Sequence, residues 1–303
     1  MIKVQNLSKK YRKKVAVDDL SFEVATGKVT GFLGPNGSGK STTMRLMLEL
    51  DQGAGNTTYE GSGLYENKLP SETVGILLEA KAFHPTRSAR NHLRVLAAAS
   101  GISDARVDEV LEIVGLTEVA KKKPGKFSLG MSQRLGIAAA ILGKPKYLLL
   151  DEPANGLDPE GIAWLRKFIE EYAKYGNAVF ISSHLLSEID QMADNVVVIG
   201  KGKMIADTSV KSLISGKGHQ SVFVRSSNKK LLETVIKKLD YKQKEGGYEV
   251  YGIDSEHLSE LLFKAKVPVS ELSNQSASLE DVFLEITSSA QEYTAKHEKK
   301  VKK

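Results

Sequence analysis

The segment GPNGSGKS constrains the fold more than any other part of this 303-residue chain. It occupies residues 34–41 and fits the spacing G-x-x-x-x-G-K-[ST] at every fixed position. An apolar run, Val29–Leu33, precedes it, and a helical pattern over Ser41–Leu50 follows it. Glycines let the backbone curl tightly and turn its N–H groups inward, and the following helix adds the positive end of its dipole. The sequence therefore predicts a strand, a phosphate-binding loop and a helix within an α/β fold.

Individual residues of this loop suit the chemistry of a bound triphosphate. Lys40 can reach the terminal phosphates, and the Ser41 hydroxyl can ligate Mg²⁺. The alternative is a glycine-rich turn that carries an exposed lysine. The candidate nucleotide-binding residues of this segment are Gly34, Pro35, Asn36, Gly37, Ser38, Gly39, Lys40, Ser41 and Thr42.

Length and composition narrow the remaining possibilities. At about 100–200 residues per domain, the chain is long enough for two domains with buried cores. Hydrophobic residues make up 41% and charged residues 26%, as in ordinary globular proteins, and the net charge is a modest +6. The lack of cysteine excludes disulfides, thiolate metal sites and cysteine nucleophiles. No apolar run approaches the roughly 20 residues of a spanning helix, so we expect a soluble, intracellular chain.

Short apolar runs alternate with helical patterns over the first two-thirds, which is typical of a parallel sheet covered by helices. Runs that are apolar throughout predict strands buried on both faces, namely Val29–Leu33, Gly75–Leu78, Tyr147–Leu150 and Ala178–Ile181. Mixed polarity predicts more exposed, partly antiparallel strands at Ile2–Leu7 and Val15–Val24. A helical subdomain is expected over about residues 86–143, with helices at Ser88–Ser100, Asp104–Val114 and Ser132–Leu142.

A change of composition at Ser215-Gly216-Lys217-Gly218 predicts a domain boundary. We expect a first domain over residues 1–215, an accessory α+β domain over 219–290 and a flexible lysine-rich tail over 291–303. The predicted elements of the second domain are strand 220–225, helix 228–239, strand 241–245, strand 248–253, helix 255–265 and strand 267–272. This βαββαβ order is that of the ferredoxin-like fold. A final helix is expected at about Leu279–Ser288.

Polar residues follow three of the buried strands, at the edge where open α/β sheets bind ligands. Asp151 suits an Mg²⁺ ligand, and the adjacent Glu152 suits a general base that polarises the attacking water. His184 suits a hydrogen bond to the γ-phosphate or to that water. Glu79 suits a water-mediated contact with Mg²⁺. The alternatives are an acidic helix cap for the carboxylate pair, a structural histidine, and a solvated loop carboxylate at Glu79.

The segment FSLGMSQR, from Phe127 to Arg134, resembles the signature of ATP-binding cassettes, whose usual form is LSGGQ followed by QR. Ser128 and Gly130 match that form. Leu and Met at positions 129 and 131 resemble a variant that is common in bacterial cassettes of the bacteriocin-immunity and bacitracin-resistance type. A serine N-cap and the free N–H groups of a helix start make a second phosphate-binding end. Residues 1–215 thus resemble the nucleotide-binding subunit of an ATP-binding cassette (ABC) transporter.

This resemblance implies the cassette fold of P-loop NTPases, with a mixed sheet, an antiparallel part and a helical subdomain. It also implies that two cassettes sandwich two ATP molecules, each held by the loop of one cassette and the signature of the other. The signature residues are Ser128, Leu129, Gly130 and Met131. The loop that crosses the dimer interface is Asn155, Gly156, Leu157 and Asp158.

Further roles follow from the same resemblance. Tyr11 would stack on adenine, with an exposed surface tyrosine as the alternative. His184 would be the switch histidine of the family. The segment Glu79–Leu93 would contact the membrane partner, and the stretch Ser278–Phe283 is similar to the end of the same bacterial branch.

We therefore expect an ATPase that uses ATP and Mg²⁺ to power a separate membrane permease, at the inner face of the cell membrane. ATP closes a cassette dimer, expected to be a homodimer, and hydrolysis reopens it. The resemblance favours export of, or resistance to, membrane-active peptides. The alternative is a soluble cassette that acts on nucleic acid or ribosomes. The lysines at 121–126 and 296–303 are most simply solvated faces, the tail also suits anionic lipid, and no nucleic acid is expected. A GTPase is disfavoured because neither Asn67-Lys68 nor Asn228-Lys229 continues as Asn-Lys-x-Asp.

Overall fold

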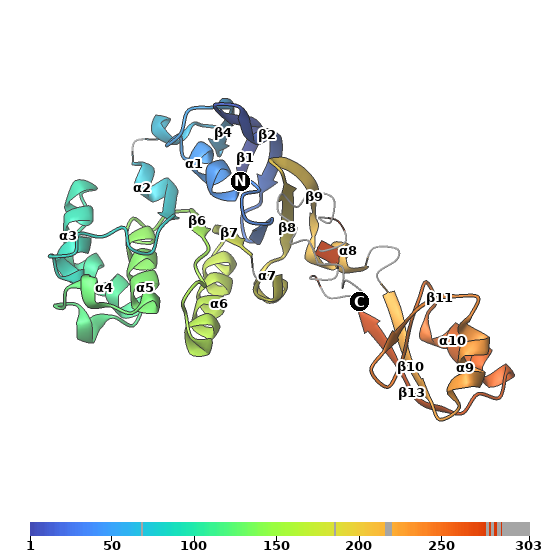
Figure 1. Cartoon of the computed structure of the whole chain (residues 1–303). Coiled ribbons are helices and arrows are strands. Elements are labelled where there is room, and N and C mark those ends of the chain that lie inside the picture. Colours follow the sequence, from blue (N-terminus) through green and yellow to red (C-terminus); the bar gives the residue numbers. More distant parts are fainter. Residues whose placement is uncertain are drawn as a thin grey trace, which may run out of the picture. The chain divides into compact units, whose positions relative to one another are not determined.

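The computed structural model describes residues 1–67, 69–184, 186–215 and 220–276, together with Leu279, Val282, Phe283 and Ile286. Within this part of the chain two compact units form, Met1–Asp207 and Thr208–Ile286 (Figure 1). The candidate site lies in the first unit.

A six-stranded sheet forms the centre of the first unit, in the order β5-β6-β7-β3-β8-β9. Its strands are β3 Val29–Leu33, β5 Val74–Leu77, β6 Tyr147–Asp151, β7 Ala178–Ser183, β8 Asn195–Gly200 and β9 Lys203–Ser209. The pairs β5-β6, β6-β7, β7-β3 and β3-β8 are parallel. The four strands predicted from uniformly apolar runs are therefore confirmed, and they are neighbours. Their carboxyl ends are in register, because Leu33 pairs with Ser183 and Asp151 pairs with Ser182.

A smaller antiparallel sheet, in the order β2-β1-β4, packs with helix α1 onto the larger one. Its strands are β1 Ile2–Tyr11, β2 Lys14–Val24 and β4 Ala54–Tyr59, and α1 spans Lys40–Met47. The rings of Phe22, Phe32 and Phe180 come from β2, β3 and β7, and their centroids lie 5.0–5.8 Å apart. Because β3 and α1 are both anchored in this apolar core, the loop between them has fixed ends.

The helical subdomain consists of α3 Ala89–Ala99, α4 Asp104–Ile113 and α5 Leu129–Ala140, which pack on one another (green in Figure 1). Helix α5 also packs closely on β5. On the sheet, α6 Pro159–Lys174 and α7 Leu186–Met192 contact β3 and β7. The short helices of this unit are η1 Leu64–Glu66, α2 Pro70–Thr73, η2 Thr117–Val119 and η3 Pro124–Lys126.

The second unit contains a four-stranded antiparallel sheet in the order β11-β12-β10-β13. Its elements are α8 Val210–Ser215, β10 Gln220–Ser226, α9 Lys229–Ile236, β11 Asp240–Lys244, β12 Gly247–Tyr251, α10 Ser255–Lys264 and β13 Val269–Ser276. The predicted βαββαβ order is confirmed, and the strand order is the one expected of the ferredoxin-like arrangement. Val222 of the sheet, Leu232 of α9 and Leu258 of α10 belong to the core of this unit, which lies between the sheet and these two helices.

Several boundaries differ from the predicted ones. Helix α1 ends at Met47 rather than Leu50, because Glu49 adopts a positive φ of 56° that a helix cannot continue through. Helix α5 begins at Leu129 rather than Ser132, because Ser128 is its N-cap. Strand β4 is not anticipated, since the sequence AGNTTY has no apolar run. The second unit begins at Thr208, ahead of the composition change at residues 215–218, because α8 groups with it.

Some predictions lie outside the described residues. They concern the linker at 216–218, most of the helix expected at 279–288 and the tail at 291–303. No helix in the described part of the chain is both long and apolar enough to cross a membrane.

Candidate functional site

The loop at residues 34–39 is held in shape by the two sheets around it. A Cβ atom on Gly34 would lie 2.4 Å from Ser38 Oγ and 2.6 Å from the carbonyl oxygen of Ile199 in β8. A Cβ atom on Gly39, which has φ of +110°, would lie 2.4 Å from the carbonyl oxygen of Ala16 in β2. Contacts within the protein itself therefore require glycine at these two positions, in addition to the tight curl of the loop.

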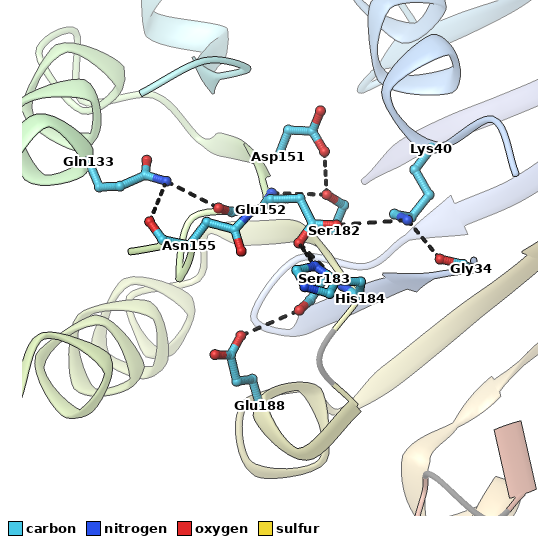
Figure 2. Close-up of polar contacts among 10 residues, drawn as sticks. All are labelled: Gly34, Lys40, Gln133, Asp151, Glu152, Asn155, Ser182, Ser183, His184 and Glu188. Atoms are coloured by element: carbon cyan, nitrogen blue, oxygen red, sulfur yellow. Dashed lines mark hydrogen bonds and ion pairs between the residues drawn. The ribbon is translucent and has the colours of Figure 1, made fainter. Parts of the chain in front are cut away.

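Lys40 is the buried cation of the site, with 7% of its surface exposed. Its Nζ atom donates a hydrogen bond to the carbonyl oxygen of Gly34 at 2.7 Å and lies 3.8 Å from Glu152 Oε1 (Figure 2). Burial lowers the pKa of Lys40, and the carboxylates of Glu152 and Asp151 partly oppose that effect. An ammonium has three donors. The described residues engage it at two atoms, and a phosphate oxygen suits the remaining donor.

Asp151 stands at the end of β6 and is held by the neighbouring strand. The Ser182 hydroxyl of β7 donates a short hydrogen bond to Asp151 Oδ1. The same hydroxyl accepts a hydrogen bond of 3.0 Å from the backbone N–H of Glu152. One buried serine therefore orients the carboxylate of one residue and the backbone of the next.

Glu152 contacts both Lys40 and His184 through its side chain. Its backbone has a φ of +50°, an uncommon conformation for a residue with a side chain. Its Oε2 atom lies 2.7 Å from Nδ1 of His184, whose backbone N–H also donates to Oε2 at 3.3 Å. The carboxylate consequently bridges the cation of Lys40 and the imidazole of His184 (Figure 2).

The signature segment lies at the start of α5 and packs on the loop after Glu152. The Ser128 hydroxyl accepts a hydrogen bond of 3.1 Å from the backbone N–H of Met131. A Cβ atom on Gly130 would lie 3.3 Å from the carbonyl oxygen of Gly156, so the start of α5 and the loop after Glu152 are in close contact. Asp158 caps α6 by accepting a hydrogen bond of 2.8 Å from the N–H of Gly161.

Three further predicted residues are Tyr11, Ser41 and Glu79. In the described part of the chain their side chains make no direct contact with the cluster of Lys40, Asp151, Glu152 and His184. Tyr11 ends β1 and is 46% exposed, its hydroxyl donates to Asp51 at 2.8 Å, and Lys9 Nζ lies 4.9 Å from its ring centroid. The ring thus has one face covered by a cation. Ser41 is exposed at the start of α1, and Glu79 is exposed just beyond β5. Their side chains meet neither each other nor Asp151 among the described residues.

Three polar residues of this site lie outside the set predicted from the sequence: Ser182, Gln133 and Glu188. Ser182 directly follows the apolar part of β7, and Gln133 lies inside FSLGMSQR. Their positions next to predicted site residues are the only sequence signal for a role of these two residues. The Gln133 amide donates to the carbonyl oxygens of Glu152 and Asn155, both at 3.2 Å. The carboxylate of Glu188 accepts a hydrogen bond of 3.4 Å from Ser183, and burial raises its pKa.

The donor set fits a hard cation next to a phosphate. Asp151 supplies a carboxylate and Ser41 an exposed hydroxyl, and oxygen atoms are the ligands that Mg²⁺ prefers. Ser38 Oγ is buried within the loop and has no hydrogen-bond partner in the described part of the chain. An unpaired buried hydroxyl beside a lysine and the start of a helix suits an anion.

Known protein families and individual proteins are similar to this chain in sequence. A family model described as ABC transporter matches residues 17–155, and one described as a domain of unknown function matches residues 220–280. The bacitracin transport ATP-binding protein BcrA of Bacillus licheniformis is 38% identical over 296 residues, which cover 94% of this chain and 97% of that protein. The lantibiotic transport ATP-binding protein SrtF of Streptococcus pyogenes is 38% identical over 208 residues, which cover 68% of this chain and 90% of that protein.

Solved structures show the same fold. The ATP-binding subunit of an ABC transporter superimposes with a TM-score of 0.64 at 27% identity, over 70% of this chain and 91% of that one. A dimeric bacterial ABC transporter cassette gives a TM-score of 0.64 at 20% identity, over 69% of this chain and 99% of that one. With the loop, the strand ends and the near-full-length relatives together, the chain belongs to the ATP-binding proteins of ABC transporters and is an ATPase of the cassette fold.

Proposed function

We propose that this chain binds ATP with Mg²⁺ at residues 34–42 and hydrolyses it with Glu152 as general base, to power a separate membrane permease. The observation that carries this proposal is the Glu152 carboxylate, which lies between Lys40 at 3.8 Å and His184 at 2.7 Å. This carboxylate stands at the carboxyl end of the parallel sheet, beside the glycine loop, where such sheets bind ligands.

Different residues of the chain bind the phosphates, hold Mg²⁺ and accept the proton during hydrolysis. The backbone N–H groups of the loop and of the start of α1 bind the β- and γ-phosphates, and Lys40 supplies a positive charge. Asp151 and Ser41 hold Mg²⁺, which neutralises phosphate charge when bound. The carboxylate of Glu152 takes a proton from the attacking water. The water oxygen bonds to the γ-phosphorus as the bond to the ADP oxygen breaks. His184 Nδ1 orients the Glu152 carboxylate for that step.

A second cassette completes the site in this proposal. The free N–H groups at the start of α5, next to Ser128, would bind the γ-phosphate held by the other cassette. The loop from Asn155 to Asp158 packs on that helix start, and it would lie at the same interface. Tyr11 would stack on adenine with the ring face that Lys9 leaves open. The dimeric state of a structurally similar cassette supports this arrangement.

The permease would dock in an apolar groove between η1, β5, α3 and α5. The groove encloses about 580 Å³ and its walls include Tyr65, Leu96 and Glu79. Tyr65 and Leu96 are 61% and 38% exposed, so part of the apolar lining of this groove is open to a partner. The relatives named for bacitracin and lantibiotic transport support membrane-active peptides as the cargo class and a peripheral location at the cytoplasmic face of the membrane. Their names give no support to the alternative function on nucleic acid or ribosomes.

The test is Mg²⁺-dependent ATP hydrolysis by the purified chain and by Glu152→Gln. Loss of a general base lowers turnover about 100-fold or more. The Kd for ATP should stay within threefold, because the amide keeps the shape of the carboxylate. Glu160→Gln, on the exposed start of α6, is the matched control and should leave turnover unchanged. Undiminished turnover in Glu152→Gln would remove this residue from the mechanism.

Docking of the permease is tested separately. Tyr65→Glu and Leu96→Glu place charge in the groove, and both side chains are exposed enough for the fold to tolerate the change. Both variants should keep basal ATPase activity and lose co-purification with a multi-spanning membrane protein in mild detergent. Retention of that protein by both variants would argue against this groove as the docking site.

A further inference from the structure

Gln133 stands where the signature helix meets the catalytic turn. It lies on α5, one helical turn after the signature start, and is only 4% exposed. Its Nε2 atom donates to the carbonyl oxygens of Glu152 and Asn155, both at 3.2 Å (Figure 2). One side-chain amide therefore holds both ends of the turn that starts at the proposed general base.

The chemistry of the turn fixes the orientation of this amide. Both facing atoms are carbonyl oxygens, which only accept hydrogen bonds, so the NH₂ end and not the oxygen end of the amide must face them. The Gln133 Oε1 atom is buried and has no hydrogen-bond partner among the described residues. The contribution of this side chain to the site is thus made by its two donors.

The turn itself needs an external support. Glu152 has a φ of +50°, and such a conformation persists where surrounding contacts over-determine it. Within the turn, the N–H of Asn155 donates to the carbonyl oxygen of Glu152 at 3.2 Å. In the described part of the chain, the carbonyl oxygen of Asn155 has its hydrogen bond from Gln133. The amide thus ties the backbone of Glu152 and the first residue of the interface loop to a single point on α5.

We propose that Gln133 is a positioning residue for ATP hydrolysis. It fixes the backbone of Glu152, and so the aim of its carboxylate, relative to the helix that starts at Ser128. A displacement of this helix start by phosphate then displaces the general base and Asn155 together. This inference rests on the proposed role of Glu152 as general base.

The test uses Gln133→Met, which keeps the length and apolar volume of the side chain and removes both donors. Turnover should fall at least tenfold, while the KM for ATP stays within twofold, because the phosphate loop is not touched. The matched control is Arg106→Met. Arg106 donates to the carbonyl oxygens of Ile141 and Leu142 at 2.6 and 3.2 Å, and so holds the other end of the same helix. This control should keep at least half of wild-type turnover.

A double-mutant cycle separates a positioning role from a structural one. If Gln133 acts through Glu152, then Gln133→Met should lower the residual rate of Glu152→Gln by less than twofold. Single-turnover reactions with labelled ATP, followed over hours, measure that residual rate. Normal turnover in Gln133→Met, an equal loss in Arg106→Met, or a full tenfold further loss in the Glu152→Gln background would overturn the proposal. Normal turnover in Glu152→Gln alone would instead overturn the proposed function.

Discussion

Replacement of Gly39 by alanine tests whether the phosphate-binding loop is locked by its contact with β2. The new Cβ atom would lie 2.4 Å from the carbonyl oxygen of Ala16, about 1 Å inside the 3.4 Å at which ordinary contact begins. Gly27→Ala is the matched control, because Gly27 also has a positive φ of +72° and a Cβ there would meet nothing within 4 Å.

The two variants share one cost and differ in another. A positive φ costs a residue with a Cβ about 1–2 kcal/mol, which is partly offset by about 0.4–1 kcal/mol from the less flexible unfolded chain. Gly27→Ala should therefore lower the free energy of unfolding by about 1 kcal/mol. The overlap in Gly39→Ala adds about 1–3 kcal/mol for forced backbone movement. The expected total for Gly39→Ala is about 2–4 kcal/mol.

Urea unfolding followed by tryptophan fluorescence measures the difference in unfolding free energy between the two variants, and it reports on the first structural unit. Trp164 is the single tryptophan of the chain, and it lies on α6 in the first unit. With an m-value of about 3 kcal/mol per molar urea, the midpoint should fall by about 1 M in Gly39→Ala and about 0.3 M in Gly27→Ala. The Kd for Mg-ATP should rise at least tenfold in Gly39→Ala alone. Equal midpoints for the two variants would refute the argument that β2 locks the loop.

Other parts of the site make further predictions. Burial raises the pKa of the Glu188 carboxyl, so the folded protein binds more protons than the unfolded chain, and this residue costs stability as pH rises above the usual glutamate pKa. Glu188→Gln should therefore raise the Tm at pH 8 with a gain that disappears toward pH 4, and a pH-independent gain would contradict this. Ser182→Ala removes the donor to Asp151 and should lower the free energy of unfolding by about 1–3 kcal/mol in urea titrations. Tyr11→Ala should weaken ATP binding about tenfold in equilibrium titrations, whereas Tyr11→Phe should bind normally, because stacking needs only the ring.

The positions of the strands and the loop follow from local sequence, and the contacts within the site do not. The four buried strands are predictable because each apolar run is continuous, as burial on both faces requires. The loop is predictable because its glycines have fixed spacing. Strand β4 escapes prediction, because all its residues except Tyr59 are small or polar and its pairing with β1 decides its structure.

Contacts between distant residues account for what the sequence leaves open at the site. The Gln133 amide meets backbone atoms about twenty positions away, and no spacing rule encodes that contact. The strained backbone of Glu152 is likewise set by its neighbours in β7 and α5. A Cβ atom on Gly39 or Gly34 would lie too close to Ala16 or Ile199, so these loop glycines serve the packing of the protein itself. The roles of all the candidate site residues stay predictions, and the side chains of Tyr11 and Glu79 do not meet Lys40, Asp151 or Glu152 in the described part of the chain.

Calorimetric titration of the purified chain with ATP in the presence of Mg²⁺ measures directly whether the loop at residues 34–42 binds a triphosphate. We expect saturable binding heat for the wild-type chain. The same titration of Lys40→Met should show a Kd weakened at least tenfold, because the buried ammonium is removed from the phosphate loop. No binding heat in the folded wild-type chain, or equal affinity in Lys40→Met, would show that this loop does not bind ATP through Lys40.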